Sequence, residues 1–135
     1  GLKYRANKII KLKNQLINEF DRKIPSNFED LKKLPGIGDY NANAILCFGF
    51  KKKRALLDNN FIRVYQRVFN VKSYTKTPKT DKFLWNFSES LLLPITSYLT
   101  FNYGVLDFGG IICLPKIPKC QICFLKEICF YEKNS

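Results

Sequence analysis

Four of the five cysteines lie within 17 residues at the end of the chain, at Cys113, Cys120, Cys123 and Cys129. Four thiolates at short, uneven spacings are typical of iron-sulfur clusters, whereas zinc sites usually present two short cysteine pairs separated by a longer spacer. Only one short pair is present here, so we expect a [4Fe-4S] cluster, with zinc as the alternative. A disulfide framework is less favoured, because a chain of 135 residues does not need covalent cross-links to fold.

The segment between the first and last of these cysteines carries three lysines, Lys116, Lys119 and Lys126. Closing the segment around a metal centre would fix these lysines on a rigid surface. A rigid basic loop meets a phosphate backbone at a lower ordering cost than a flexible one. The fifth cysteine, Cys47, lies apart in an apolar stretch, and we expect it to be a buried thiol.

The remainder of the chain has helical periodicity and no strand-period segment of useful length, which predicts an all-α fold. Helices are expected over 3–20, from a capping box at 26–29 to Lys33, from Asp39 to about Phe50, from Asn59 to Phe69, from a Thr80 cap to Leu92, and over 97–112. Residues 71–79 are expected to form a loop. We expect 1–96 to be part of a helical domain and 97–135 to be a helix followed by the cysteine loop.

A tight turn at Pro35, Gly36, Ile37 and Gly38 separates two of the expected helices. Its glycines allow another molecule to approach the backbone closely, and the next helix points free N–H groups and its positive dipole end at that position. A phosphate is the natural ligand, so Leu34, Gly36, Ile37 and Gly38 are candidate DNA-binding residues. By itself this is a weak signal, because the same residues also make an ordinary corner between helices.

Asp58 follows the apolar residues Ala55, Leu56 and Leu57 and precedes the expected helix at Asn59. One role for it is a helix N-cap that accepts backbone hydrogen bonds. The same location suits a functional carboxylate, which would stabilise a cationic sugar or position a water. Asp39 and Asp81 have the positions of ordinary helix-start residues. Gly104, Gly109 and Gly110 predict close backbone packing of the last long helix.

The charge balance favours a nucleic-acid partner: 23 Lys and Arg against 11 Asp and Glu give a formal net charge of +12. A lysine-rich solvated surface is the alternative. The absence of histidine excludes histidine bases and histidine-ligated metals. No apolar run approaches the roughly 18 residues that cross a bilayer, and no signal peptide is apparent, so we expect an intracellular protein without membrane contact.

Three segments resemble the helix-hairpin-helix DNA glycosylase superfamily, which includes endonuclease III, adenine glycosylases and thymine mismatch glycosylases. They are LPGIGDYNANAI, LLDNNFIRVYQRVF and FNYGVLDFGGIIC, the last leading into the four cysteines. The resemblance implies a partial helical barrel, a helix-hairpin-helix at about 34–50, and a [4Fe-4S] loop at Cys113, Cys120, Cys123 and Cys129. It also implies that Gly36 and Gly38 hold the DNA backbone and that Asp58 is the catalytic carboxylate.

The family flips a base out of double-stranded DNA and cleaves its N-glycosidic bond in base-excision repair. Two residues after the second hairpin glycine, bifunctional endonuclease III relatives have a Schiff-base lysine and adenine glycosylases commonly a serine. Here this residue is Tyr40, as in thymine mismatch glycosylases, and a phenol forms no imine. We therefore expect a monofunctional, monomeric enzyme that removes thymine or uracil opposite guanine from mismatched DNA. Tyr40 as a packing residue is the alternative.

Two other functions stay open from the sequence. One is an adenine glycosylase that acts on A:G or A:oxidised-G mispairs. The other is a DNA-binding iron-sulfur module without catalysis, because the chain has no methionine and opens inside an expected helix. We expect from this that an N-terminal portion is missing. The resemblance implies that the missing helices contribute to the base pocket, so the piece alone would lack part of the site.

Overall fold

The computed structural model describes residues 2–134, which contain helices and no strand. The predicted all-α class is confirmed. The chain divides into two compact units, Gly1–Lys52 and Lys53–Ser135, and each is described by itself. The boundary expected at 96/97 falls inside the second unit. Within 2–134, no helix combines the length and the apolar character needed to traverse a bilayer.

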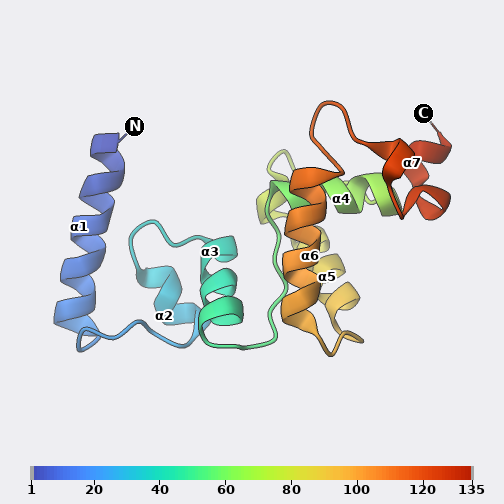
Figure 1. Ribbon diagram of the computed structural model, residues 1–135. Helices are drawn as coiled ribbons and strands as arrows, with labels where there is room; N and C mark the ends of the chain where they lie inside the picture. Colours follow the sequence, from blue (N-terminus) through green and yellow to red (C-terminus); the bar gives the residue numbers. More distant parts are fainter. Residues whose placement is uncertain (1, 135) are drawn as a thin grey trace. The chain divides into compact units, whose positions relative to one another are not determined.

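The first unit contains α1 (Leu2–Glu19), α2 (Phe28–Lys33) and α3 (Asp39–Ala44), and the chain continues from α3 into a π-helical turn, η1 (Ile45–Gly49) (Figure 1). These positions confirm the three helices predicted in this part, except that the third is α-helical only as far as Ala44. A small core holds the unit together, because the apolar faces of all three helices meet in it. Its buried members are Leu31, Leu34, Ala42 and Leu46.

The start of α2 differs from the prediction by one residue. The N-cap is Asn27 and not Ser26: the Asn27 side chain accepts a hydrogen bond from the Asp30 N–H at 2.9 Å. Asn27 Nδ2 in turn donates to the Asp30 carboxylate at 2.8 Å. The Asn27 and Asp30 pair therefore replaces the capping box predicted for Ser26 and Glu29. Asn and Ser are about equally good caps, and Asp30 supplies the carboxylate three residues beyond Asn27.

The second unit contains α4 (Asn59–Phe69), η2 (Pro78–Thr80), α5 (Lys82–Leu92), α6 (Tyr98–Ile111), η3 (Cys120–Ile122), η4 (Lys126–Ile128) and α7 (Phe130–Lys133) (Figure 1). The helices predicted over 59–69 and 97–112 are confirmed. Helix α4 packs on both α6 and α7. Its apolar face supplies much of the core, with Phe61 and Tyr65 almost completely buried.

The start of α5 also differs from the prediction by one residue, because Asp81 is the N-cap and Thr80 belongs to η2. The Asp81 carboxylate accepts from the Phe83 N–H at 2.9 Å, the Tyr74 N–H at 2.6 Å and the Ser73 hydroxyl at 2.7 Å. A carboxylate has two oxygens and can satisfy all three donors, which a threonine hydroxyl cannot. The expectation that Asp81 is a helix-start residue is confirmed.

A buried series of hydrogen bonds connects α4 and α5. The Ser88 hydroxyl donates to the Leu56 carbonyl at 2.9 Å, so its oxygen is left to accept from the Tyr65 hydroxyl at 3.1 Å. Burial raises the pKa of Tyr65 to about 12, and the hydrogen bond to Ser88 opposes this shift. Both hydroxyls are thereby satisfied inside an apolar core, where an unpaired one would be destabilising.

Candidate functional site

The hairpin between α2 and α3 is a tight turn that depends on one glycine. Gly36 has φ +85°, a backbone conformation that residues with a side chain rarely adopt. The turn is closed by a backbone hydrogen bond from Ile37 to Leu34 at 3.1 Å. Gly38 is the N-cap of α3, and no side chain caps this end of the helix. The N–H groups of the first turn of α3 therefore have no side-chain acceptor at the cap, which suits them to an external anion.

The hairpin residues predicted to contact DNA differ in exposure. Gly36 and Gly38 are exposed and Ile37 is half-buried, whereas the Leu34 side chain is only 4% exposed and belongs to the core. Only the backbone of Leu34 is therefore placed for a contact. Tyr40 lies half-buried in the first turn of α3.

In the second unit, Asp58 is the N-cap of α4. Its Oδ1 accepts from the backbone N–H groups of Asn60 at 2.8 Å and Phe61 at 3.0 Å, and its Oδ2 accepts from Asn60 Nδ2 at 3.2 Å. Ala55, Leu56 and Leu57 are buried and anchor the chain just before it. The cap role is confirmed, and the carboxylate is held half-exposed in a defined orientation at the positive end of a helix.

Asn60 and Arg63 join this carboxylate to the cysteine loop. Asn60 Oδ1 accepts from Arg63 Nη2 at 2.8 Å, and Arg63 Nε donates to the backbone carbonyl of Cys113 at 2.7 Å. The sequence analysis did not identify these residues. The signal available was their spacing: Asn60, Arg63 and Arg67 recur at i, i+3 and i+7, which places polar side chains along one face of α4.

Close packing of α6 occurs at only one of the three glycines predicted for it. A Cβ at Gly109 would lie 2.7 Å from Asn60 Cβ, so no side chain fits there. The expectation was wrong for Gly104 and Gly110, where nothing lies within 4 Å of a Cβ. The difference arises because only Gly109 faces the first turn of α4.

The structure brings the four terminal cysteines together. Cys113, Cys120, Cys123 and Cys129 line the same small cavity of about 20 Å³, which Arg67 and Lys119 also line. All five cysteines are free thiols in the structure. Among residues 2–134, no three cysteine or acidic side chains are arranged to hold a single metal ion. Cys47 is completely buried in the first unit, as expected.

Arg67 holds the start of the cysteine loop from α4. Its guanidinium donates to the carbonyls of Leu114 at 2.6 Å and Pro115 at 2.8 Å, and to Cys113 Sγ at 3.5 Å. It also lies over the Tyr131 ring, 5.0 Å from the centroid. Two carbonyls held by one planar guanidinium give the loop a fixed orientation, and a positive charge lies next to the sulfur of Cys113.

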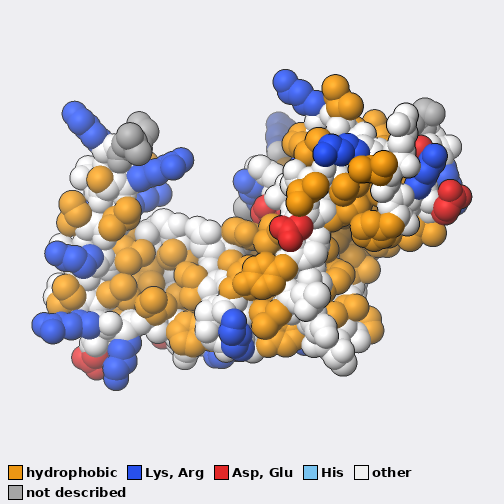
Figure 2. Space-filling model, in the orientation of Figure 1, with side chains coloured by type: hydrophobic (Ala, Val, Ile, Leu, Met, Phe, Trp, Pro, Cys, Tyr) orange, Lys and Arg blue, Asp and Glu red, His pale blue; other side chains and the backbone are white. Residues whose placement is uncertain are grey.

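The surface of the loop is basic, whereas Cys113 and Cys129 are buried and Cys120 and Cys123 are half-buried. Lys116 and Lys119 are exposed, whereas Lys126 pairs with Glu132 at 3.9 Å. Burial, with a smaller contribution from the Glu132 carboxylate, raises the pKa of the Cys120 thiol to about 11. On the face drawn in Figure 2, Lys and Arg side chains occur over both units and acidic ones are few, in keeping with the net charge of +12.

Comparison with known proteins shows which proteins this chain resembles in sequence and fold. Residues 19–48 match the family model described as the helix-hairpin-helix motif. The structure superimposes on a thermostable thymine-DNA glycosylase with a TM-score of 0.87 and 36% identity, covering 98% of this chain and 60% of that chain. The resemblance to the helix-hairpin-helix DNA glycosylases is therefore confirmed.

Two relatives show which kinds of glycosylase the chain resembles in sequence. The chain is 45% identical over 134 residues to the thymine/uracil-DNA glycosylase of Pyrobaculum aerophilum, which covers 96% of this chain and 58% of the relative. It is 39% identical over 138 residues to the adenine DNA glycosylase of Buchnera aphidicola subsp. Schizaphis graminum, which covers 99% of this chain and 40% of the relative. The chain thus spans about three fifths of the thymine/uracil relative and a smaller part of the adenine one.

Proposed function

We propose that this chain acts as part of a monofunctional DNA glycosylase that removes thymine or uracil opposite guanine from double-stranded DNA in base-excision repair. The observation that carries the proposal is the Asp58 carboxylate, held half-exposed at the N-terminus of α4 by two backbone N–H groups. The 45% identity to a thymine/uracil-DNA glycosylase supports the choice of base.

The hairpin would hold the DNA backbone. Its exposed glycines, Gly36 and Gly38, let a phosphate approach the backbone, and the uncapped start of α3 supplies N–H donors and a partial positive charge. Lys116 and Lys119 on the cysteine loop would add phosphate contacts. Such contacts bind any sequence, so the choice of a mismatch would come from the lower cost of flipping a mispaired base.

Asp58 would act on the flipped nucleotide. The bond between the sugar C1′ and the base nitrogen breaks, and its electron pair leaves with the base. Positive charge then develops on the sugar, and an adjacent carboxylate stabilises it. Water adds to C1′ and gives up a proton, for which Asp58 is the acceptor. With Tyr40 at the position of the Schiff-base lysine, the reaction stops at the abasic site and leaves the strand intact.

The cysteine loop would hold a [4Fe-4S] cluster through Cys113, Cys120, Cys123 and Cys129. The donor set fits this group, because all four thiols line one cavity and Arg67 and Lys119 supply positive charge beside it. When bound, the cluster would cross-link the loop and keep its lysines in place.

The test is a base-release assay on duplexes with T:G, U:G and A:oxidised-G pairs. The chain is assayed in two forms: alone, and mixed with the part of the P. aerophilum glycosylase that lies outside the matched region. Asp58→Asn keeps the helix cap, because Asn caps as well as Asp, but removes the charge. Asp81→Asn is the matched control, because it changes another N-cap in the same way, on α5.

The proposal is supported if the wild type and Asp81→Asn release thymine or uracil and Asp58→Asn does not. The DNA strands must also stay intact until they are treated with alkali. Release of adenine alone would instead identify an adenine glycosylase, an activity that the similarity to the Buchnera protein also allows. Binding of DNA without any base release would leave a non-catalytic module.

A further inference from the structure

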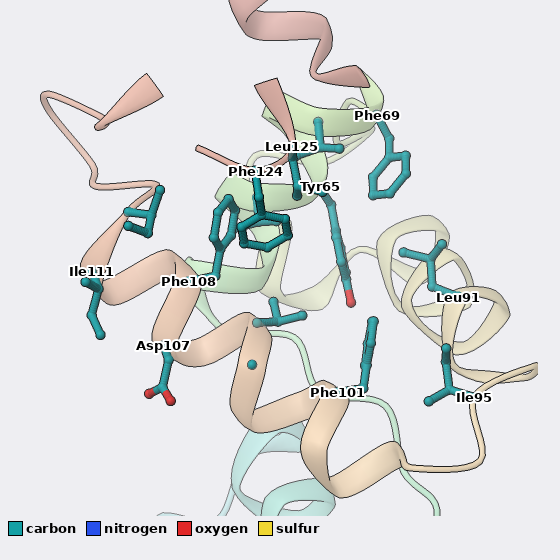
Figure 3. Close-up of a pocket in the computed structure, with 15 residues that line it drawn as sticks. Tyr65, Phe69, Leu91, Ile95, Phe101, Asp107, Phe108, Ile111, Phe124 and Leu125 are labelled. Atoms are coloured by element: carbon teal, nitrogen blue, oxygen red, sulfur yellow. The ribbon is translucent and has the colours of Figure 1, made fainter. Parts of the chain in front are cut away.

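The apolar groove of the second unit is unsuited to DNA. It has a volume of about 680 Å³ and lies between α4, α5, α6 and the cysteine loop, where side chains such as Phe101, Phe108 and Phe124 gather around it (Figure 3). Its one charged lining residue, Asp107, is negative, as DNA is. A further contact to the DNA backbone must therefore come from basic side chains elsewhere, and the first unit places one beside the hairpin.

Lys8 of α1 lies against the hairpin turn. A Cβ at Gly36 would lie 3.3 Å from Lys8 Cδ and 4.0 Å from Lys8 Nζ. The stem of the lysine thus packs against the side of the turn that glycine leaves open, and the ammonium reaches the same turn. Lys8 is accordingly half-buried, whereas residues 3–7, 9 and 10 of α1 are exposed. A long basic side chain can pack its stem in this way and still present its charge to solvent.

The register of α1 explains where Lys8 lies. Leu12 and Leu16 pack against the core of the first unit, and Lys8 precedes Leu12 by four residues, so it continues the same face of the helix by one turn. Tyr4 lies one turn further, and the Lys8 ammonium lies over its ring, 4.5 Å from the centroid. The ring and the turn together restrict the lysine side chain, so less conformational freedom is lost when its ammonium binds an anion.

The lysines of α2, which precede the hairpin, are already paired with carboxylates. Lys32 pairs with Asp39 in the first turn of α3. Lys33 pairs with Asp30 at 2.6 Å. Among the described residues 2–134, no carboxylate forms such a pair with Lys8. A phosphate at the turn can therefore bind the Lys8 ammonium without displacing a carboxylate from it.

We propose that Lys8 binds the DNA phosphate that the hairpin holds. The proposal rests on the proposed function in one respect, because it takes the hairpin as the site of the DNA backbone. Lys8 reaches this phosphate from α1, on the side of the turn that Gly36 leaves open. A phosphate contact is independent of the base, so it adds affinity and salt dependence without sequence preference.

The test measures binding of a matched DNA duplex, so it needs no base release and can fail independently of the glycosylase proposal. Fluorescence anisotropy over a series of salt concentrations compares the wild-type chain with Lys8→Met and Lys8→Arg. Methionine keeps most of the stem that packs on Gly36 and removes the charge, whereas arginine keeps the charge. Lys13→Met is the matched control, because Lys13 is exposed on the same helix and lies about 140° around its axis from Lys8.

We expect Lys8→Met to reduce the slope of log K against log salt by about 1 and to weaken binding about fivefold to tenfold near 0.1 M salt. Lys8→Arg and Lys13→Met should bind with the slope of the wild type. Thermal unfolding followed by circular dichroism should be the same for all four proteins, which would show that the packing of α1 on the hairpin is retained.

An unchanged slope in Lys8→Met, or an equal reduction in Lys13→Met, would overturn the inference. So would a loss in Lys8→Arg as large as that in Lys8→Met, because the role of Lys8 would then be packing and not charge, and so would a wild type that binds no DNA. If the variants differ as expected but the protein releases no base, the inference stands and the glycosylase proposal fails.

Discussion

The side chain of Asn60 occupies the space that a Cβ at position 109 would need, 2.7 Å from Asn60 Cβ. The same Asn60 donates to the Asp58 carboxylate and accepts from Arg63. The candidate catalytic carboxylate is thus oriented by a contact between α4 and α6 as well as by its own helix. Any residue other than glycine at 109 would force a shift at Asn60, the residue that donates to Asp58.

Gly109→Ala should therefore destabilise the second unit, although alanine favours helices. Overpacking at a tight contact costs about 1 to 3 kcal/mol, which exceeds the gain in helix propensity. The adjacent Gly110→Ala has open space and should stabilise by roughly 0.5 to 1 kcal/mol. Urea denaturation followed by circular dichroism measures both. A Gly109→Ala variant as stable as Gly110→Ala would show that the contact can relax without cost.

Arg67→Lys should reduce the amount of the proposed [4Fe-4S] cluster that the chain retains. Lysine keeps the charge but cannot hold the carbonyls of Leu114 and Pro115 together, so the cysteine loop loses its fixed orientation. Iron and acid-labile sulfide per chain should fall relative to the wild type and to Arg5→Lys on α1, which is the control. If the purified protein is colourless and contains zinc, the iron-sulfur proposal is wrong.

Lys116→Gln should weaken DNA binding equally for matched and mismatched duplexes. The exposed lysine would contact phosphate, so its loss should reduce the slope of log K against log salt by about 1. Fluorescence anisotropy over a series of salt concentrations gives the slope. Lys82→Gln, at the first residue of α5, serves as the control and should leave the slope unchanged. An unchanged slope for Lys116→Gln would remove this lysine from the DNA-binding surface.

Asp81 should make stability depend on pH in the acid range. The Ser73 hydroxyl, followed by the N–H groups of Tyr74 and Phe83, lowers the pKa of Asp81 below its ordinary value of 3.8. In the unfolded chain the carboxylate therefore takes up a proton first as the pH falls. The stabilisation is complete above 3.8 and is lost as the pH drops from there through the lower folded pKa.

Urea denaturation between pH 5 and the acid limit of folding tests this expectation. Asp81→Asn should flatten the pH dependence in this window, and Ser73→Ala, which removes the largest cause of the shift, should reduce it partly. If all three proteins lose stability in parallel, other carboxylates account for the acid sensitivity.

Much of the candidate site could be predicted from local sequence, because its contacts are local. Asp58 accepts hydrogen bonds from residues two and three positions ahead, and such a cap is visible in the sequence. The two predicted caps that were wrong each lie one residue from the true cap. Ser26 and Thr80 stand next to Asn27 and Asp81. For Asp81 the choice depended on Ser73 and Tyr74, eight and seven residues away, whereas Asn27 caps through Asp30, three residues ahead.

The sequence by itself determined the helices, the glycine turn at Gly36 and the clustering of four cysteines, because periodicity, positive φ and close spacing act within a few residues. Tertiary structure decided which of three glycines on α6 meets Asn60, that Arg63 reaches Cys113 fifty residues away, and where apolar surface is left uncovered. These outcomes depend on which helix faces pack together. Three glycines on one helix look alike until a neighbouring helix lies against one of them.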